Sequence, residues 1–293
     1  MARRGNFDIF GHYKWCVPDT PGLFILILML LLGVLVGNLV SAIFIAILGM
    51  ETGMQYGTLV AYPLMFIIPM LWASGKSRRA CMTEHGALLD NNGFAPLGGW
   101  LAALLVVLGT LAAAICCDAI SSAMPPMPEW LEKTLKGLTT GNFWINFICV
   151  SIFAPFFEEW LCRGMVLRGL LAHGNKPWLA IVISALFFAI IHMNPWQAIP
   201  AFLLGLLFGY VYYKTGSLKL TMLMHFTNNT MALVIGHIDS LKDAETWVDV
   251  LGPGYWFVFC GCILLLALVV LAFRKIPGSP KGNFEIVKPL FSE

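Results

Sequence analysis

The chain has 293 residues, of which 59% are hydrophobic and only 12% are charged, and its formal net charge is +2. Together with a mean hydropathy of +0.80, this composition excludes an ordinary soluble domain and predicts a polytopic membrane protein. The small net charge also gives no reason to expect binding to nucleic acid. The expected surroundings are therefore a lipid bilayer.

Eight apolar segments are candidates to cross about 30 Å of hydrocarbon as helices. In chain order they are residues 23–49, 55–74, 97–120, 142–160, 178–193, 196–213, 217–236 and 254–273. The fifth and sixth segments are short and are joined tightly through Asn194 and Pro195. We therefore expect an all-α, polytopic integral membrane protein of about eight transmembrane helices that form a single domain over residues 1–293.

The basic residues alternate between the two sides of these segments, as the positive-inside rule requires. With the N-terminus inside, 15 of the 18 lysines and arginines fall on the cytoplasmic side. They are Arg3, Arg4, Lys14, Lys76, Arg78, Arg79, Arg163, Arg168, Lys176, Lys214, Lys219, Arg274, Lys275, Lys281 and Lys288, and the other three are Lys133, Lys136 and Lys242. We expect a multi-pass protein of the plasma membrane with both termini in the cytoplasm.

Polar side chains gather in the spans between residues 142 and 236. The set is Glu158, Glu159, Arg163, His192, Asn194, His225, Asn228 and Asn229. Ionisable residues inside spans usually face a cavity and are functional, because a charge in hydrocarbon costs a few kcal/mol. The alternative for the glutamates is that they mark the cytoplasmic end of a span, and for the histidines that they are hydrogen-bonded in the core or lie at the interface. The pattern favours a polar catalytic pocket among spans 4 to 7.

Helical spacing predicts which of these side chains share a face. Glu159 and Arg163 are four residues apart and can form a salt bridge, whereas Glu158 points about 100 degrees away. His225 and Asn229 are also four apart and project from one face of their span.

The depth of the polar residues depends on the length of the fourth helix. If that helix runs unbroken over about 143–172, it is about 45 Å long and Glu158 lies near its middle. We then expect Glu158, His192 and His225 to share one level, in a water-filled pocket in the cytoplasmic half of the bilayer. Pro155 has no N–H to donate, so the helix should kink just before Glu158.

Three short motifs resemble those of the CPBP family, which comprises the CAAX proteases and bacteriocin-processing relatives often called Abi proteins. The EExxxR motif corresponds to Glu158, Glu159 and Arg163, the FxxxH motif to Phe188 and His192, and the HxxxN motif to His225 and Asn229. The resemblance covers about 155–230, and we take residues 141–236 as the catalytic core.

The resemblance implies an intramembrane endopeptidase that cleaves a peptide or a membrane-anchored protein. It implies that Glu158 and His192 activate water and that His225 and Asn229 hold the oxyanion. Glu159 and Arg163 would hold the helix and Glu158 in place.

Other functions stay open at this stage. The family has been described both as glutamate proteases and as metalloproteases, and Glu158, His192 and His225 could ligate zinc. Because the chain has no HExxH motif, we favour a mechanism without a metal or another cofactor. A non-catalytic immunity or scaffold protein of the same fold is a second alternative, and a transporter ranks last because there are no paired repeats of interrupted spans.

Overall fold

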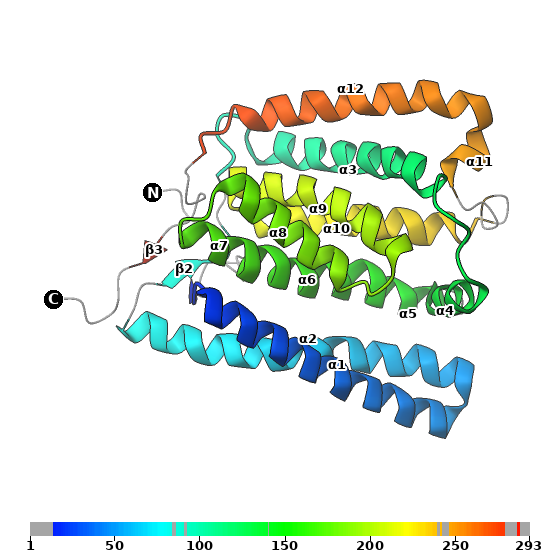
Figure 1. Cartoon of the computed structure of the whole chain (residues 1–293), viewed down its shortest axis with the longest axis horizontal. Helices are drawn as coiled ribbons and strands as arrows, with labels where there is room; N and C mark the ends of the chain where they lie inside the picture. The colour runs from blue at the N-terminus through cyan, green and yellow to red at the C-terminus, as the bar shows by residue number, and fades with distance from the viewer. Residues whose placement is uncertain are drawn as a thin grey trace.

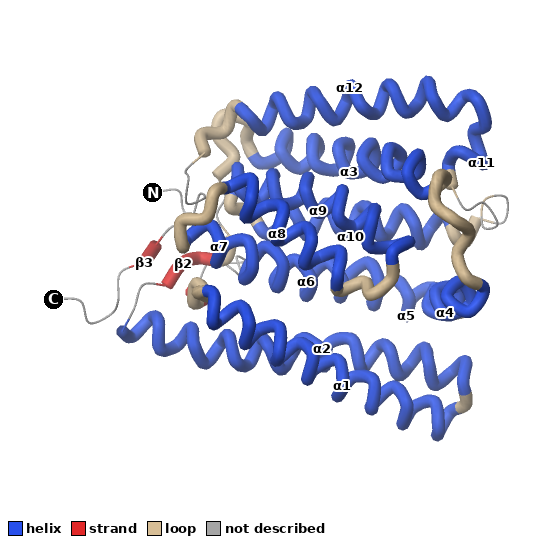
Figure 2. Tube along the Cα trace, viewed as in Figure 1, coloured by secondary structure: helices blue, strands red, loops and turns tan. Residues whose placement is uncertain are grey.

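The computed structural model describes residues 14–83, 86–90, 93–139, 141–238, 241, 246–278 and 286–287. Most of these residues are helical, as the composition predicts (Figure 2). Five basic residues used in the topology argument lie outside the described ranges, namely Arg3, Arg4, Lys242, Lys281 and Lys288. Both chain termini also lie outside them, so their cytoplasmic location stays a prediction.

The helical elements form one long series. In chain order they are α1 (Thr20–Leu48), α2 (Met50–Thr83), α3 (Gly99–Ser121), α4 (Glu129–Thr139), α5 (Phe143–Asn146), η1 (Phe147–Phe153), α6 (Ala154–Glu159), η2 (Trp160–Leu167), α7 (Arg168–Ala172), α8 (Pro177–Ile190), α9 (Pro195–Thr215), α10 (Leu218–Ile235), α11 (Trp247–Leu251), η3 (Gly252–Gly254) and α12 (Tyr255–Arg274). Three short strands, β1 (Lys14–Trp15), β2 (Gly86–Leu88) and β3 (Ile286–Val287), pair antiparallel in the order β1-β2-β3. The sequence analysis did not predict this small sheet.

Six helices in the described part of the chain are long and apolar enough to cross a membrane, so this is a multi-pass integral membrane protein. They are Thr20–Leu48, Met50–Arg78, Gly99–Ser121, Phe143–Ala172, Pro195–Thr215 and Trp247–Arg274. The predicted fifth span corresponds to α8, which is apolar but has only 14 residues. The predicted seventh span corresponds to α10, which carries the polar residues and is not among the six. The structure thus supports six of the eight predicted spans.

The long helices lie side by side in a bundle, with the α1–α2 hairpin on one side and α12 on the other (Figure 1). At one end of the bundle α2, α7, α9 and α12 finish and α3, α8 and α10 begin (Figure 1). We call this the basic end, because ten basic residues of the described ranges belong to it: Lys14, Lys76, Arg78, Arg79, Arg168, Lys176, Lys214, Lys219, Arg274 and Lys275. Among the described residues, the opposite end has Lys133 as its exposed lysine, on α4.

Exposed tryptophans occur near both ends of the bundle. Trp100 and Trp178 belong to the basic end, and Trp130, Trp144 and Trp256 belong to the opposite end. Tryptophan is enriched at both membrane–water interfaces, since its ring is apolar and its N–H is polar. The two groups therefore fit the two surfaces of a bilayer that the helices cross.

The fourth predicted helix is unbroken over Phe143–Ala172, longer than the predicted span of 142–160, and Glu158 lies near its middle. It is not a uniform α-helix, since η1 and η2 are π-helical. The first π-helical stretch ends two residues before Pro155, and the Ala154 N–H reaches back to the Cys149 carbonyl. The disturbance expected around Pro155 therefore takes the form of a π-helical stretch, which is common at functional sites.

Candidate active site

A buried ion pair holds the middle of the 143–172 helix. Arg163 Nη1 lies 2.7 Å from Glu159 Oε1, and both side chains are fully buried. This confirms the pairing predicted from their four-residue spacing. Burying both charges is costly, and Glu159 Oε2 and Arg163 Nε have no hydrogen-bond partner among the described residues.

Arg163 has further partners on neighbouring helices. Its Nη2 donates to the Gly205 carbonyl on α9 at 3.1 Å, and its guanidinium lies 4.6 Å from the Phe188 ring centroid. A side chain at position 205 would contact Ala185 of α8 at 3.1 Å, so glycine permits this close packing of α8 and α9. Arg163 therefore links three helices beneath the polar pocket.

His225 joins this network from α10, a contact that the sequence analysis did not predict. Its Nδ1 lies 3.1 Å from Glu159 Oε1, and the histidine side chain is buried. Because a carboxylate accepts hydrogen bonds, Nδ1 carries the proton and Nε2 is left to face other groups. Glu159 thus orients His225 in addition to pairing with Arg163.

Glu158 points to a different partner, as its helical position predicts. Its Oε1 accepts a hydrogen bond from the Tyr62 hydroxyl on α2. Its Oε2 is buried and has no hydrogen-bond partner among the described residues. Tyr62 packs against Phe66, and Phe66 stacks on Phe157 with ring centroids 5.2 Å apart. Tyr62 therefore fixes one carboxylate oxygen, while the other is buried without a hydrogen-bond partner among the described residues.

His192 follows the C-terminal end of α8 and is half-buried. Its Nδ1 lies 2.8 Å from the Phe188 carbonyl one turn earlier, so the carbonyl accepts and Nδ1 is protonated. The Nε2 of the neutral ring is then a free acceptor. Asn194, which the sequence analysis grouped with the polar residues of the spans, instead caps α9 by accepting from the Gln197 N–H.

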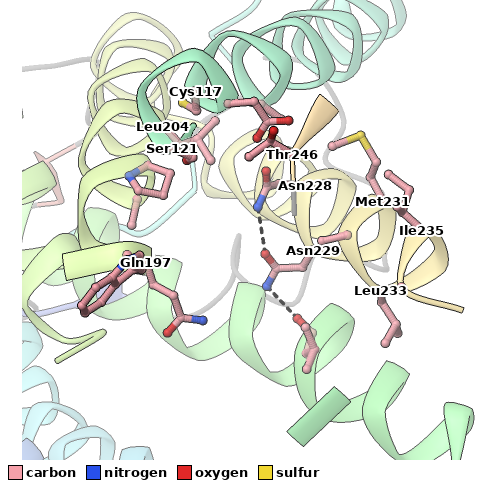
Figure 3. Close-up of a pocket in the computed structure, with 18 of the residues that line it drawn as sticks. Cys117, Ser121, Gln197, Leu204, Asn228, Asn229, Met231, Leu233, Ile235 and Thr246 are labelled. Atoms are coloured by element: carbon pink, nitrogen blue, oxygen red, sulfur yellow. Dashed lines mark hydrogen bonds between the residues drawn. The ribbon is translucent and has the colours of Figure 1, made fainter. Parts of the chain in front are cut away.

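Asn229 reaches across from α10 to the π-helical stretch. Its Nδ2 donates to the Val150 carbonyl at 2.8 Å, and its Oδ1 accepts from Asn228 Nδ2 at 3.1 Å (Figure 3). An amide nitrogen has two hydrogens, so one remains available. The carbonyl within η1 is thus satisfied by a side chain of the pocket.

These residues line two adjacent cavities. The larger has a volume of about 790 Å³ and is lined by His192, His225 and Asn229. The smaller, of about 200 Å³, is lined by Tyr62, Glu158 and again His192. Val150, His192 and Gln197 line both. The structure therefore brings Glu158 and His192 to one cavity and His225 and Asn229 to the next, with His192 between them.

Both cavities lie towards the opposite end of the bundle, away from the basic end. The larger one is lined by Ser121 at the end of α3, by His237 after α10 and by Trp247 at the start of α11. Its lining from α9 extends no further towards the basic end than Phe208. We expected a pocket in the cytoplasmic half; in the predicted orientation, the turns and loops that line the larger cavity belong to the other side.

A model of the Rce1-like family, described as type II CAAX prenyl endopeptidase, matches residues 140–231. Residues 140–231 are an Rce1-like family domain. No match was found among the curated proteins or among the solved structures compared with the chain. The Rce1-like domain contains Glu158, Glu159, Arg163, His192, His225 and Asn229, all of the predicted site residues.

Tyr62 lies outside the Rce1-like domain, and the sequence analysis missed it. It lies within the second predicted span, where a tyrosine is an unremarkable core residue. Its neighbours Pro63 and Pro69 lie inside α2, and their spacing gave no signal of a site either. Only the packing of α2 against the 143–172 helix reveals the contact.

A zinc site does not fit the described side chains. No group of three or more His, Cys, Asp or Glu residues among them is close enough to hold one metal ion. Glu158 lines the smaller cavity, whereas His225 lines the larger one and is turned by its Nδ1 towards Glu159. Glu158, His192 and His225 are thus not arranged as a set of metal ligands.

Proposed function

We propose that the protein is an intramembrane endopeptidase that resembles the CAAX-type proteases and hydrolyses a peptide bond with an activated water molecule. The observation that carries this proposal is that Glu158, whose Oε2 has no partner among the described residues, lines one cavity together with His192 inside the Rce1-like domain. A buried carboxylate in the middle of a span is costly, and catalysis explains why it is there.

Glu158 acts as the general base in this proposal. Its Oε2 takes a proton from the water while the water oxygen bonds to the peptide carbonyl carbon. His192 accepts a hydrogen bond from the same water through Nε2, since its Nδ1–H is held by the Phe188 carbonyl. When the C–N bond breaks, the proton on Glu158 passes to the leaving amine, and the base is restored.

His225 and Asn229 stabilise the negative charge that develops on the carbonyl oxygen. Asn229 donates through the amide hydrogen that Val150 does not use. Because the Nδ1–H of His225 is held by Glu159, the ring donates through Nε2 only in the form that carries a proton on both nitrogens. Because His192 borders both cavities, the scissile bond would lie beside His192, between the base and these donors.

We further propose that eight helices cross the plasma membrane, with both termini in the cytoplasm and one domain that has its catalytic core at 141–236. The two helices added to the six are α8 and α10. α8 packs antiparallel against α9, which is one of the six helices long enough to cross the membrane (Figure 1). α8 therefore also runs along the axis of the bundle. Its terminal turn at 191–194 lengthens it towards the opposite end.

A panel of membrane-anchored reporter peptides tests this function. Purified protein in detergent is incubated with each peptide in water enriched in oxygen-18, and the masses of the products are measured by mass spectrometry. We expect cleavage of at least one peptide, with one heavy oxygen in the new carboxyl group. Absence of cleavage across the panel, or equal cleavage by the Glu158→Ala protein, would contradict the proposed endopeptidase activity. A non-catalytic immunity or scaffold function would then be favoured.

A further inference from the structure

The two ends of the bundle differ in how they are built. We call the basic end closed because none of its described residues lines either cavity. Arg168 is fully buried there and donates from Nη2 to the Cys16 carbonyl at 2.5 Å. Trp15 packs edge-on against Trp160 with ring centroids 5.5 Å apart. The segment before α1 therefore covers the C-terminal part of the 143–172 helix.

A second set of contacts closes the basic end next to α9 and α10. Asp90 is buried and accepts from the Ser217 hydroxyl at 3.1 Å, while Lys219 Nζ lies 3.1 Å from its other oxygen. The Tyr212 hydroxyl donates to the Leu89 carbonyl at 3.0 Å. The residues that precede α3 are thus bonded to the ends of α9 and α10, and no residue of this set lines either cavity.

The opposite end is hollow. The larger cavity begins among Ser121, His237, Thr246 and Trp247 and reaches inwards to His225. Figure 3 shows Ser121 from α3, Gln197 from α9 and Asn228 from α10 around this space. Access to the catalytic groups from water is therefore from this end.

The distribution of charge says which face of the membrane this end occupies. Ten basic residues of the described ranges belong to the closed end, whereas Lys133 and Lys136 on α4 belong to the hollow end. By the positive-inside rule the closed end is cytoplasmic. The hollow end then faces the other side of the membrane.

The lining of the larger cavity also disfavours a substrate cut close to its own C-terminus. Asp118 is the one aspartate or glutamate among its described lining residues, which include no lysine and no arginine. A free terminal carboxylate would therefore have no lysine or arginine to pair with and would meet Asp118 instead. An uncharged stretch of backbone that continues past the cleavage site fits better.

We propose that the enzyme receives its substrate from the non-cytoplasmic face and cuts an internal bond in the extracytoplasmic juxtamembrane segment of a membrane-anchored protein. A cytoplasmic prenylated C-terminus is then not its substrate. This proposal rests on the proposed function, but the side of access can be tested separately from activity.

Sealed right-side-out and inside-out membrane vesicles that contain the full chain decide the matter. A soluble, membrane-impermeant quenched peptide with an amidated C-terminus is added outside, after detergent assays have established that the protein cleaves it. We expect right-side-out vesicles to cleave it at about the detergent rate and inside-out vesicles to cleave it only after permeabilisation. Cleavage by intact inside-out vesicles alone would overturn the proposal.

Cysteine labelling gives an answer that does not depend on activity. Gln197→Cys introduces a thiol at an exposed position of the cavity lining, and Lys176→Cys introduces one at an exposed position of the basic end. The native cysteines give the same background in both proteins. In right-side-out vesicles an impermeant maleimide should label the Gln197→Cys protein above background and spare the Lys176→Cys protein. The reverse pattern would show that the cavity faces the cytoplasm, even if the protein cleaves no peptide.

Discussion

The Tyr62 hydroxyl on α2 donates a hydrogen bond to Glu158 Oε1, which leaves Oε2 as the carboxylate oxygen without a partner among the described residues. A carboxylate fixed through one oxygen can present the other in a single direction, and orientation of this kind lowers the barrier for proton transfer. The donor comes from a helix outside the Rce1-like domain.

Tyr62→Phe removes this hydroxyl and keeps the ring. Loss of a hydrogen bond to a charged group costs about 1.5–3 kcal/mol, so we expect kcat to fall by about 10- to 150-fold. KM should change little, whereas the melting temperature in detergent should fall, because the folded protein loses the same hydrogen bond. Tyr56→Phe, an exposed position on the same helix, serves as the matched control. A raised KM with an unchanged kcat would mean that Tyr62 binds substrate instead.

Glu159→Gln should lower the stability of the folded protein. It leaves the fully buried Arg163 without its carboxylate and removes the partner of His225. Removing one member of a buried pair costs about 3–5 kcal/mol. We expect a clearly lower melting temperature in detergent, and Arg163→Met in the Glu159→Gln background should recover part of it. An unchanged melting temperature for the single variant would contradict the structural role of the pair.

Asn229→Ala should reduce kcat by about 100- to 1,000-fold, the loss expected on deleting one oxyanion donor. The control is Thr227→Ala, since the Thr227 hydroxyl donates to the Leu223 carbonyl of its own helix and does not line the cavities. Steady-state kinetics on the reporter peptide measure both. A loss no greater than that of the control would remove Asn229 from the oxyanion site.

Metal chelation should leave turnover unchanged. The described side chains do not gather three ligands around one point, so activity should not depend on bound zinc. Elemental analysis of active protein should find well under one zinc per chain. If zinc is stoichiometric and is lost together with activity in the His192→Ala and His225→Ala proteins, these histidines are ligands and the glutamate mechanism is wrong.

Local spacing predicted the contacts that lie within one helix. Glu159 and Arg163 are a turn apart, so helical geometry alone brings them together, and the structure confirms the pair. The same geometry separates Glu158 from Glu159 and explains why the two glutamates have different partners. The apolar pattern predicted a span over 142–160, and the structure extends this helix to Ala172.

Contacts between helices could not be predicted in this way. Tyr62 and Glu158 are 96 residues apart, and His225 and Glu159 are 66 apart, and no period in the sequence relates them. The end of the bundle towards which the cavities lie could not be predicted either, because depth was considered for each helix separately. The direction in which a cavity opens depends on how far neighbouring helices and their loops extend, as Ser121 and Trp247 illustrate.

The most direct test of the account is the turnover of the Glu158→Gln protein. The amide keeps the shape of the side chain but cannot take a proton from water, so kcat should fall by about 100- to 10,000-fold in a protein that still inserts, folds and melts like the wild type. Glu51→Gln, at an exposed position on α2, should retain full activity. Turnover near the wild-type value in the Glu158→Gln protein would contradict the claim that Glu158 activates the water.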